Sequence, residues 1–111
     1  MDSGHRAPDL TCALPPAELR ARRAELQREL APALLEVEPT AGGYRFWFDA
    51  TAQRLAQIAE LIAFEKECCA FLDFRLELTA GAERVALEIA GPPEARPTIE
   101  ALFVAAVRPG G

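Results

Sequence analysis

Residues 72–79 alternate strictly between apolar and polar side chains, and this pattern restricts the fold more than any other feature of the chain. The apolar positions are Leu72, Phe74, Leu76 and Leu78. A period of two is typical of a strand with one buried face. The turn sequence AGAE (80–83) follows, and the next apolar positions are Val85, Leu87 and Ile89. Residues 72–89 therefore predict a β-hairpin.

A second hairpin is predicted earlier in the chain. The segments LLEVEP (34–39) and GYRFWFD (43–49) both alternate, and TAGG supplies the turn between them. In the second of these strands the aromatic residues Tyr44, Phe46 and Phe48 share one face. The opposite face of the whole sheet is expected to carry Arg45, Trp47, Arg75, Glu77, Arg84 and Glu88.

Helical periodicity occupies the rest of the chain. A first amphipathic helix is predicted near 15–31, beginning at Pro15–Pro16 and ending at Pro32. A second is predicted at 51–69, with Asp49 or Thr51 as its cap. A third is placed after Pro97. The apolar stripes are, in chain order, Leu19, Leu26, Leu30 and Leu34; Leu55, Ile58, Leu61, Ile62 and Phe64; and Ile99, Leu102, Phe103, Ala106 and Val107.

The predicted element order is α-ββ-α-ββ-α. The simplest architecture is an α+β fold in which a four-stranded, mainly antiparallel sheet carries its helices on one face. A chain of 111 residues suffices for one such domain, expected at 12–108 after a flexible tail at 1–11.

Composition excludes several classes of function. No apolar run is long enough to span a membrane, and the polar N-terminus lacks the layout of a secretory signal, so we expect a cytoplasmic protein without a membrane partner. The net charge of −5 disfavours nucleic-acid binding. An arginine cluster at 20–28 is interleaved with glutamates, for example Glu18 and Arg22 at i,i+4, and is interpreted as a solvated helix face.

The three cysteines are expected to be thiols, because the number is odd and the cytoplasm is reducing. Cys68 and Cys69 are adjacent, at the predicted C-terminal end of the second helix. The helix terminus and the nearby Glu65 and Glu67 should raise the pKa of both thiols, which makes them poor nucleophiles. The single histidine, His5, is in the tail, so catalysis by a cysteine–histidine pair is not expected.

Coordination of a soft metal removes the thiol proton outright, so the same residues make reasonable ligands. Two thiolates suit mercuric ion, and Cys12 as a third sulfur would suit arsenite. Zinc fits less well, because it normally takes four ligands and Glu65 or His5 would have to join. This hypothesis needs Cys12 to lie near the pair.

Two other interpretations remain open from the residues alone. The cysteines suit an inert part of the core in an interaction module, and Trp47 on the open face suggests a homodimer through that face. An enzymatic role is less favoured than binding. It would be a thiol oxidoreductase cycling through a Cys12–Cys68 or a Cys68–Cys69 disulfide.

Two segments, LTCALPPAELRARRAEL (10–26) and LIAFEKECCAFLDFRLEL (61–78), resemble a group of small uncharacterised bacterial proteins. The group often accompanies mercury or arsenic resistance functions. The matching positions are Cys12, Glu65, Lys66, Cys68, Cys69, Phe71 and Phe74. Ala70 departs from the proline usual after the cysteine pair. The resemblance implies a thiol site for a soft metal or metalloid at Cys12, Cys68 and Cys69, with Glu65 beside them.

Overall fold

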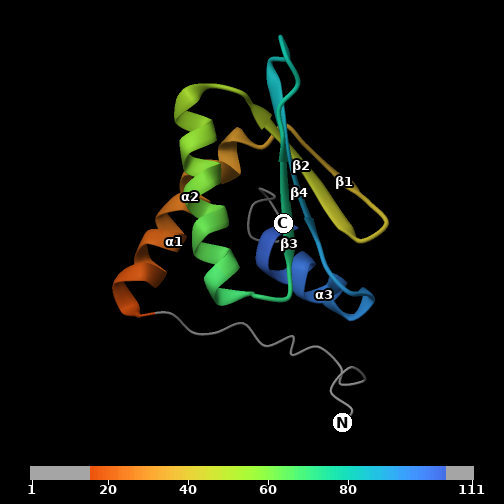
Figure 1. Cartoon of the computed structure of the whole chain (residues 1–111). Helices are drawn as coiled ribbons and strands as arrows, with labels where there is room; N and C mark the ends of the chain where they lie inside the picture. The colour runs from red at the N-terminus through yellow and green to blue at the C-terminus, as the bar shows by residue number, and fades with distance from the viewer. Residues whose placement is uncertain (1–15, 105–111) are drawn as a thin grey trace.

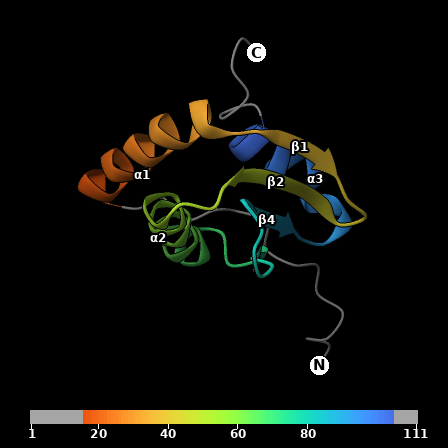
Figure 2. The same ribbon diagram turned by 90° about the horizontal axis from the view of Figure 1, so that it is seen from above.

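The computed structural model describes residues 16–104. In this range a four-stranded antiparallel sheet carries three helices, and the elements follow the predicted order α-ββ-α-ββ-α (Figures 1 and 2). The α+β fold is therefore confirmed. The predicted tail at 1–11, and positions 12–15 and 105–108 of the predicted domain, lie outside the described residues.

The first two helices form close to where the sequence predicts them. Helix α1 spans Ala17–Leu30 and runs into a 3-10 turn at Ala31–Ala33, which contains Pro32. Helix α2 spans Ala52–Cys68. Thr51 caps it, because its Oγ1 accepts a hydrogen bond of 3.1 Å from the N–H of Arg54.

The third helix begins earlier than the sequence suggests. A 3-10 turn at Pro93–Ala95 leads into α3 at Arg96–Ile99, and a π-helical turn at Glu100–Val104 continues it. The prediction that the helix starts after Pro97 is wrong. Pro97 is the second residue of the helix, where the missing N–H has no partner to lose.

The strands are β1 at Glu36–Pro39, β2 at Gly43–Asp49, β3 at Asp73–Glu77 and β4 at Arg84–Ala90. Their order in the sheet is β1-β2-β4-β3, with every neighbouring pair antiparallel. Strands β2 and β4 are therefore central, and β1 and β3 are the two edges. Gly43 has to be glycine, because a Cβ there would lie 1.9 Å from the carbonyl oxygen of Ile89.

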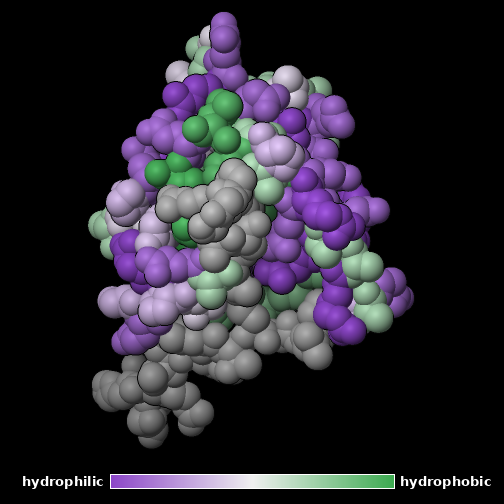
Figure 3. Space-filling view, turned by 180° about the vertical axis from the view of Figure 1, so that it is seen from behind, coloured by the Kyte–Doolittle hydropathy of each residue, from purple (hydrophilic) through white to green (hydrophobic). Residues whose placement is uncertain are grey.

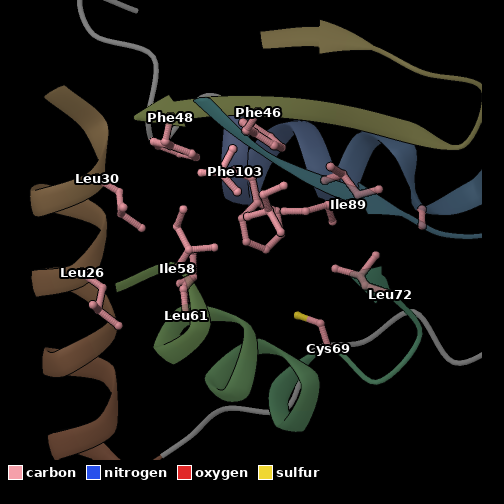
Figure 4. Close-up of a cluster of buried hydrophobic side chains, with 14 residues drawn as sticks. Leu26, Leu30, Phe46, Phe48, Ile58, Leu61, Cys69, Leu72, Ile89 and Phe103 are labelled. Carbon is pink, nitrogen blue, oxygen red and sulfur yellow. The ribbon is translucent and has the colours of Figure 1, made fainter. Parts of the chain in front are cut away.

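The core lies between the sheet and the helices. Figure 4 shows Leu26 and Leu30 of α1 and Ile58 and Leu61 of α2 pointing toward the aromatic face of the sheet. The predicted inward face of β2 and β4 is confirmed. The buried apolar residues are Leu26, Leu30, Phe46, Phe48, Ile58, Leu61, Cys69, Leu72, Val85, Ala86, Leu87, Ile89, Ala95, Ile99 and Phe103.

Three leucines of the predicted apolar stripes are exposed instead. Leu19, in the first turn of α1, is 45% exposed, and Leu76 and Leu78 are 39% and 53% exposed. In Figure 1 the start of α1 lies away from the sheet, and the tip of the β3–β4 hairpin projects past the helices. Strand β3 therefore directs its apolar side chains to the predicted face of the sheet, but no described helix covers the half of the strand nearest the hairpin tip.

The open face of the sheet is charged. Trp47 is only half-buried, its Nε1 donates to Oε1 of Glu38 at 3.0 Å, and the Arg84 guanidinium lies 4.5 Å from its ring centroid. Seen from behind, the described surface is mainly hydrophilic, and its most strongly hydrophobic area lies in the upper half (Figure 3). Over residues 16–104, no helix has the length and apolarity needed to cross a membrane.

Candidate functional site

The predicted cysteine pair lies where α2 ends and the chain turns toward β3. Cys68 is the last residue of the helix, and Cys69 leaves the helical conformation with φ −122° and ψ 72°. The N–H of Cys69 still donates to the carbonyl of Glu65 at 2.7 Å, and its own carbonyl accepts from the N–H of Leu72 at 3.1 Å. The pair is therefore held by backbone hydrogen bonds on both sides.

The two sulfurs have different environments. The Cys69 side chain points into the core and is 1% exposed (Figure 4), whereas Cys68 is half-buried. Cys68 is a free thiol, whereas Cys69 is disulfide-bonded, so the prediction that all three cysteines are thiols is wrong for Cys69. Cys12, the predicted third sulfur, lies outside the described residues.

Glu65 lies beside this pair and is fully buried, the single buried charged residue between 16 and 104. Its Oε1 is 3.7 Å from Sγ of Cys69. Its Oε2 accepts a hydrogen bond from Nε of Arg23, which reaches across from α1. Burial raises the pKa of the Glu65 carboxyl, and the guanidinium of Arg23 opposes this rise.

The thiol of Cys68 has a raised pKa. Burial is the largest cause, and the carboxylates of Glu65 and Glu67 add to it, while Arg23 acts in the opposite direction. The direction agrees with the prediction of a raised pKa, although burial contributes more to it than the acidic neighbours do.

Arg23 is a candidate site residue that the sequence pattern did not indicate. The sequence pattern predicts that the arginine cluster at 20–28 faces solvent. Arg22 agrees with this prediction, because it contacts the surface residues Glu25 and Glu60 at 2.7 Å each. Arg23 instead turns inward, and its side chain is 23% exposed. Its spacing from Leu26 and Leu30, three and seven residues on, places it on the buried side of the helix and was the available signal.

The described residues do not complete a metal site by themselves. Among residues 16–104 no three histidine, cysteine, aspartate or glutamate side chains are grouped closely enough to hold a metal ion. The structure therefore brings Glu65 to Cys69, but it does not join Cys68 to them as a three-ligand set.

Compared with known proteins, the chain matches no protein-family model, no curated protein and no solved structure. Functional inference therefore rests on the chemistry of the site.

Proposed function

We propose that this protein binds a soft metal ion or metalloid through the sulfurs of Cys68 and Cys69, with Cys12 as the third sulfur. The observation that carries the proposal is the fully buried carboxylate of Glu65, 3.7 Å from Sγ of Cys69 and paired with Arg23. Mercuric ion and arsenite are the candidate ligands, and zinc is a weaker one.

A buried ion pair is an expensive way to hold two helices together. Removing the Glu65 carboxylate from water costs several kcal/mol, even though the Arg23 side chain remains 23% exposed, and apolar residues of similar volume often stabilise a fold as well or better. The Arg23–Glu65 pair is therefore better explained by chemistry than by stability. Because Glu65 lies beside the sulfur of Cys69, we take that chemistry to involve the thiol.

Metal coordination requires a thiol to release its proton. A carboxylate with a raised pKa, placed against Cys69, is a suitable acceptor for that proton, because burial favours its neutral form. Arg23 then balances the negative charge that the thiolates bring into the core. Glu65 therefore acts as a proton acceptor and Arg23 as the counter-charge.

A redox enzyme is the second candidate, and one observation favours it. A free thiol at Cys68 next to a disulfide at Cys69 is an arrangement in which thiol–disulfide exchange is possible. Exchange requires a thiolate, however, and the raised pKa of Cys68 leaves little thiolate at neutral pH. Binding is therefore preferred over redox catalysis.

The third candidate is an interaction module using the Trp47 face, with inert cysteines. Trp47, Arg45 and Arg84 line a shallow hollow of about 560 Å³ on that face. Arg84 is paired with Glu36 at 2.7 Å, and Trp47 is bonded to Glu38 at 3.0 Å, so these groups already have partners within the chain. The Trp47 face is therefore a weaker candidate for a homodimer interface.

The binding proposal requires a reducing compartment, for which we propose the cytoplasm. Cys69 has to be reduced before it coordinates a metal, and the cytoplasm keeps thiols reduced. A cytoplasmic chelator or carrier is the role that we propose for the protein.

Native mass spectrometry of the full chain tests the proposal. The protein is reduced with a phosphine, because thiol reductants compete for soft metals, and mixed with mercuric ion, arsenite or zinc. We expect one mercuric or arsenite ion per chain, with weaker retention by Cys12→Ser, Cys68→Ser and Cys69→Ser. Glu65→Gln should weaken retention about ten-fold, whereas Glu94→Gln, at an exposed position, serves as the matched control.

Three results would contradict the proposal. Retention of no ion would remove the metal site altogether. Retention by Cys68→Ser and by Cys69→Ser that equals retention by the wild type would show adventitious capture by single thiols. Undiminished arsenite binding by Cys12→Ser would remove Cys12 from the ligand set.

A further inference from the structure

The two edges of the sheet are unequal. Edge strand β1 carries Glu36 and Glu38 and ends at Pro39, whose nitrogen cannot donate a hydrogen bond. Charged side chains and proline are the usual protection of an edge against pairing with another chain. Strand β3, the other edge, contains no proline, and within residues 16–104 it pairs with β4 on one side only.

Strand β3 also exposes apolar side chains. A row of apolar residues crosses the helix face of the sheet through the paired positions Val37, Phe46, Leu87 and Leu76. Phe46 and Leu87 are buried, but Leu76 is 39% exposed at the end of the row. Leu78, just past the end of β3, is 53% exposed. The apolar surface therefore continues to the edge of the sheet.

On the open face, a row of side chains with alternating charge ends at this edge. Paired positions cross the four strands in the order Glu38, Arg45, Glu88 and Arg75, so the signs alternate. Glu88 contacts Arg45 at 3.1 Å and Arg75 at 3.4 Å. Arg75 ends the row and its side chain is 73% exposed. An acidic residue next to Arg75 would extend the alternation.

We infer that β3 pairs with the β3 of a second copy, antiparallel and with Leu76 opposite Leu76, to give an eight-stranded sheet. In this register Arg75 of each copy lies opposite Glu77 of the other copy. The alternation of positive and negative side chains on the open face therefore continues from one copy into the next. On the helix face Leu76 meets Leu76, and Phe74 meets Leu78. Opposite charges and apolar pairs directly across two strands are the contacts that stabilise a sheet.

Other registers are less favourable. A register centred on Arg75 sets Arg75 against itself and Asp73 against Glu77, and one centred on Glu77 sets Glu77 against itself. A register centred on Phe74 leaves Leu78 uncovered. A slip of one residue would place apolar side chains opposite charged ones. The chain is thus self-complementary in one alignment that covers both exposed leucines.

Sedimentation of the full chain at up to about 100 µM tests this interface, because a dimer with a micromolar Kd is largely assembled there. We expect a dimer for the wild type. Glu77→Arg should weaken it by about ten-fold or more, since two attractive pairs become repulsive. The double exchange R75E/E77R should restore it. Glu94→Arg, an exposed charge reversal away from β3, is the matched control and should leave the dimer unchanged.

Cross-linking tests the register independently of stability. Facing Cα atoms of antiparallel strands are about 4.5 or 5.5 Å apart, within the range of a disulfide. Leu76→Cys should therefore give a covalent dimer under mild oxidation, whereas Leu35→Cys, 57% exposed but away from β3, should not. A monomeric wild type, a Glu77→Arg variant that dimerises like the wild type, or equal cross-linking by both cysteine variants would overturn the inference.

Discussion

Arg23 of α1 and Glu65 of α2 form an ion pair at the end of the core, although 42 residues separate them in the sequence. Glu65 is fully buried and Arg23 is partly exposed, so the guanidinium reaches the carboxylate from the solvent side. The pair connects the two longest helices at the point where the cysteine pair begins. It is the relationship on which the proposed site depends.

Replacing Arg23 by methionine should lower the free energy of unfolding by about 2 to 4 kcal/mol at neutral pH, because Glu65 stays buried without its counter-charge. Urea denaturation measures this. The double variant R23M/E65L should recover most of the loss, since an apolar pair replaces the charges. Arg28→Met, at an exposed position of the same helix, should change stability by less than about 0.5 kcal/mol. An Arg23→Met protein with an unchanged free energy of unfolding would show that the ion pair does not contribute to stability.

Glu65 should also leave a signature in the pH dependence of stability. Its pKa is raised in the folded protein above the ordinary value of 4.5, so between the two values the folded state binds more protons than the unfolded state. The contribution of Glu65 to the free energy of unfolding is then present below a pH of about 4.5, and it is lost as the pH rises through the pKa of the folded state.

Urea denaturation of the wild type and of Glu65→Gln between pH 4 and pH 7 isolates this contribution. The wild type should lose stability relative to the variant as pH rises. Asp49 and Glu60 have lowered pKa values and therefore give slopes of the opposite sign, but both are present in the two proteins and cancel in the difference. A difference that does not change with pH would show that Glu65 has no raised pKa.

The thiol of Cys68 should react slowly at neutral pH. Its pKa lies above the ordinary value of 9.0, so alkylation by iodoacetamide should keep accelerating as pH passes 9. Peptide mass spectrometry resolves the Cys68 rate. Glu67→Gln removes one of the two carboxylates that raise the pKa and should accelerate the reaction at a given pH, while Glu94→Gln should not. A rate that levels off below pH 8 would favour a redox role over binding.

Gly43→Ala should prevent normal pairing of β2 with β4, because the added Cβ would lie 1.9 Å from the carbonyl oxygen of Ile89. We expect a loss of about 3 kcal/mol or more, or failure to fold. Gly81→Ala is the useful contrast. Gly81 has φ +77° and open space around it, so the variant should lose only about 1 kcal/mol from backbone strain. Circular dichroism with thermal unfolding distinguishes the two, and similar losses for both would contradict the predicted clash.

Much of the candidate site could be predicted from the sequence. The adjacent cysteines, the acidic neighbourhood and the end of the helix are all local features, and the structure has Cys68 as the last residue of α2 with a raised pKa. The contribution of Arg23 could not be predicted from charge pattern alone. An arginine beside glutamates usually faces water, and only the packing of α1 against α2 makes it the partner of a buried carboxylate.

By itself, the sequence determined which segments are helices and strands, their order, and the inward face of the central strands. These properties follow from periodicity and turn residues, which act over a few neighbouring positions. The tertiary structure alone decided that β3 is an edge, that Leu76 and Leu78 remain exposed, and that Glu65 is fully buried. Burial depends on what packs against a residue from elsewhere in the chain, and a local pattern cannot specify that neighbour.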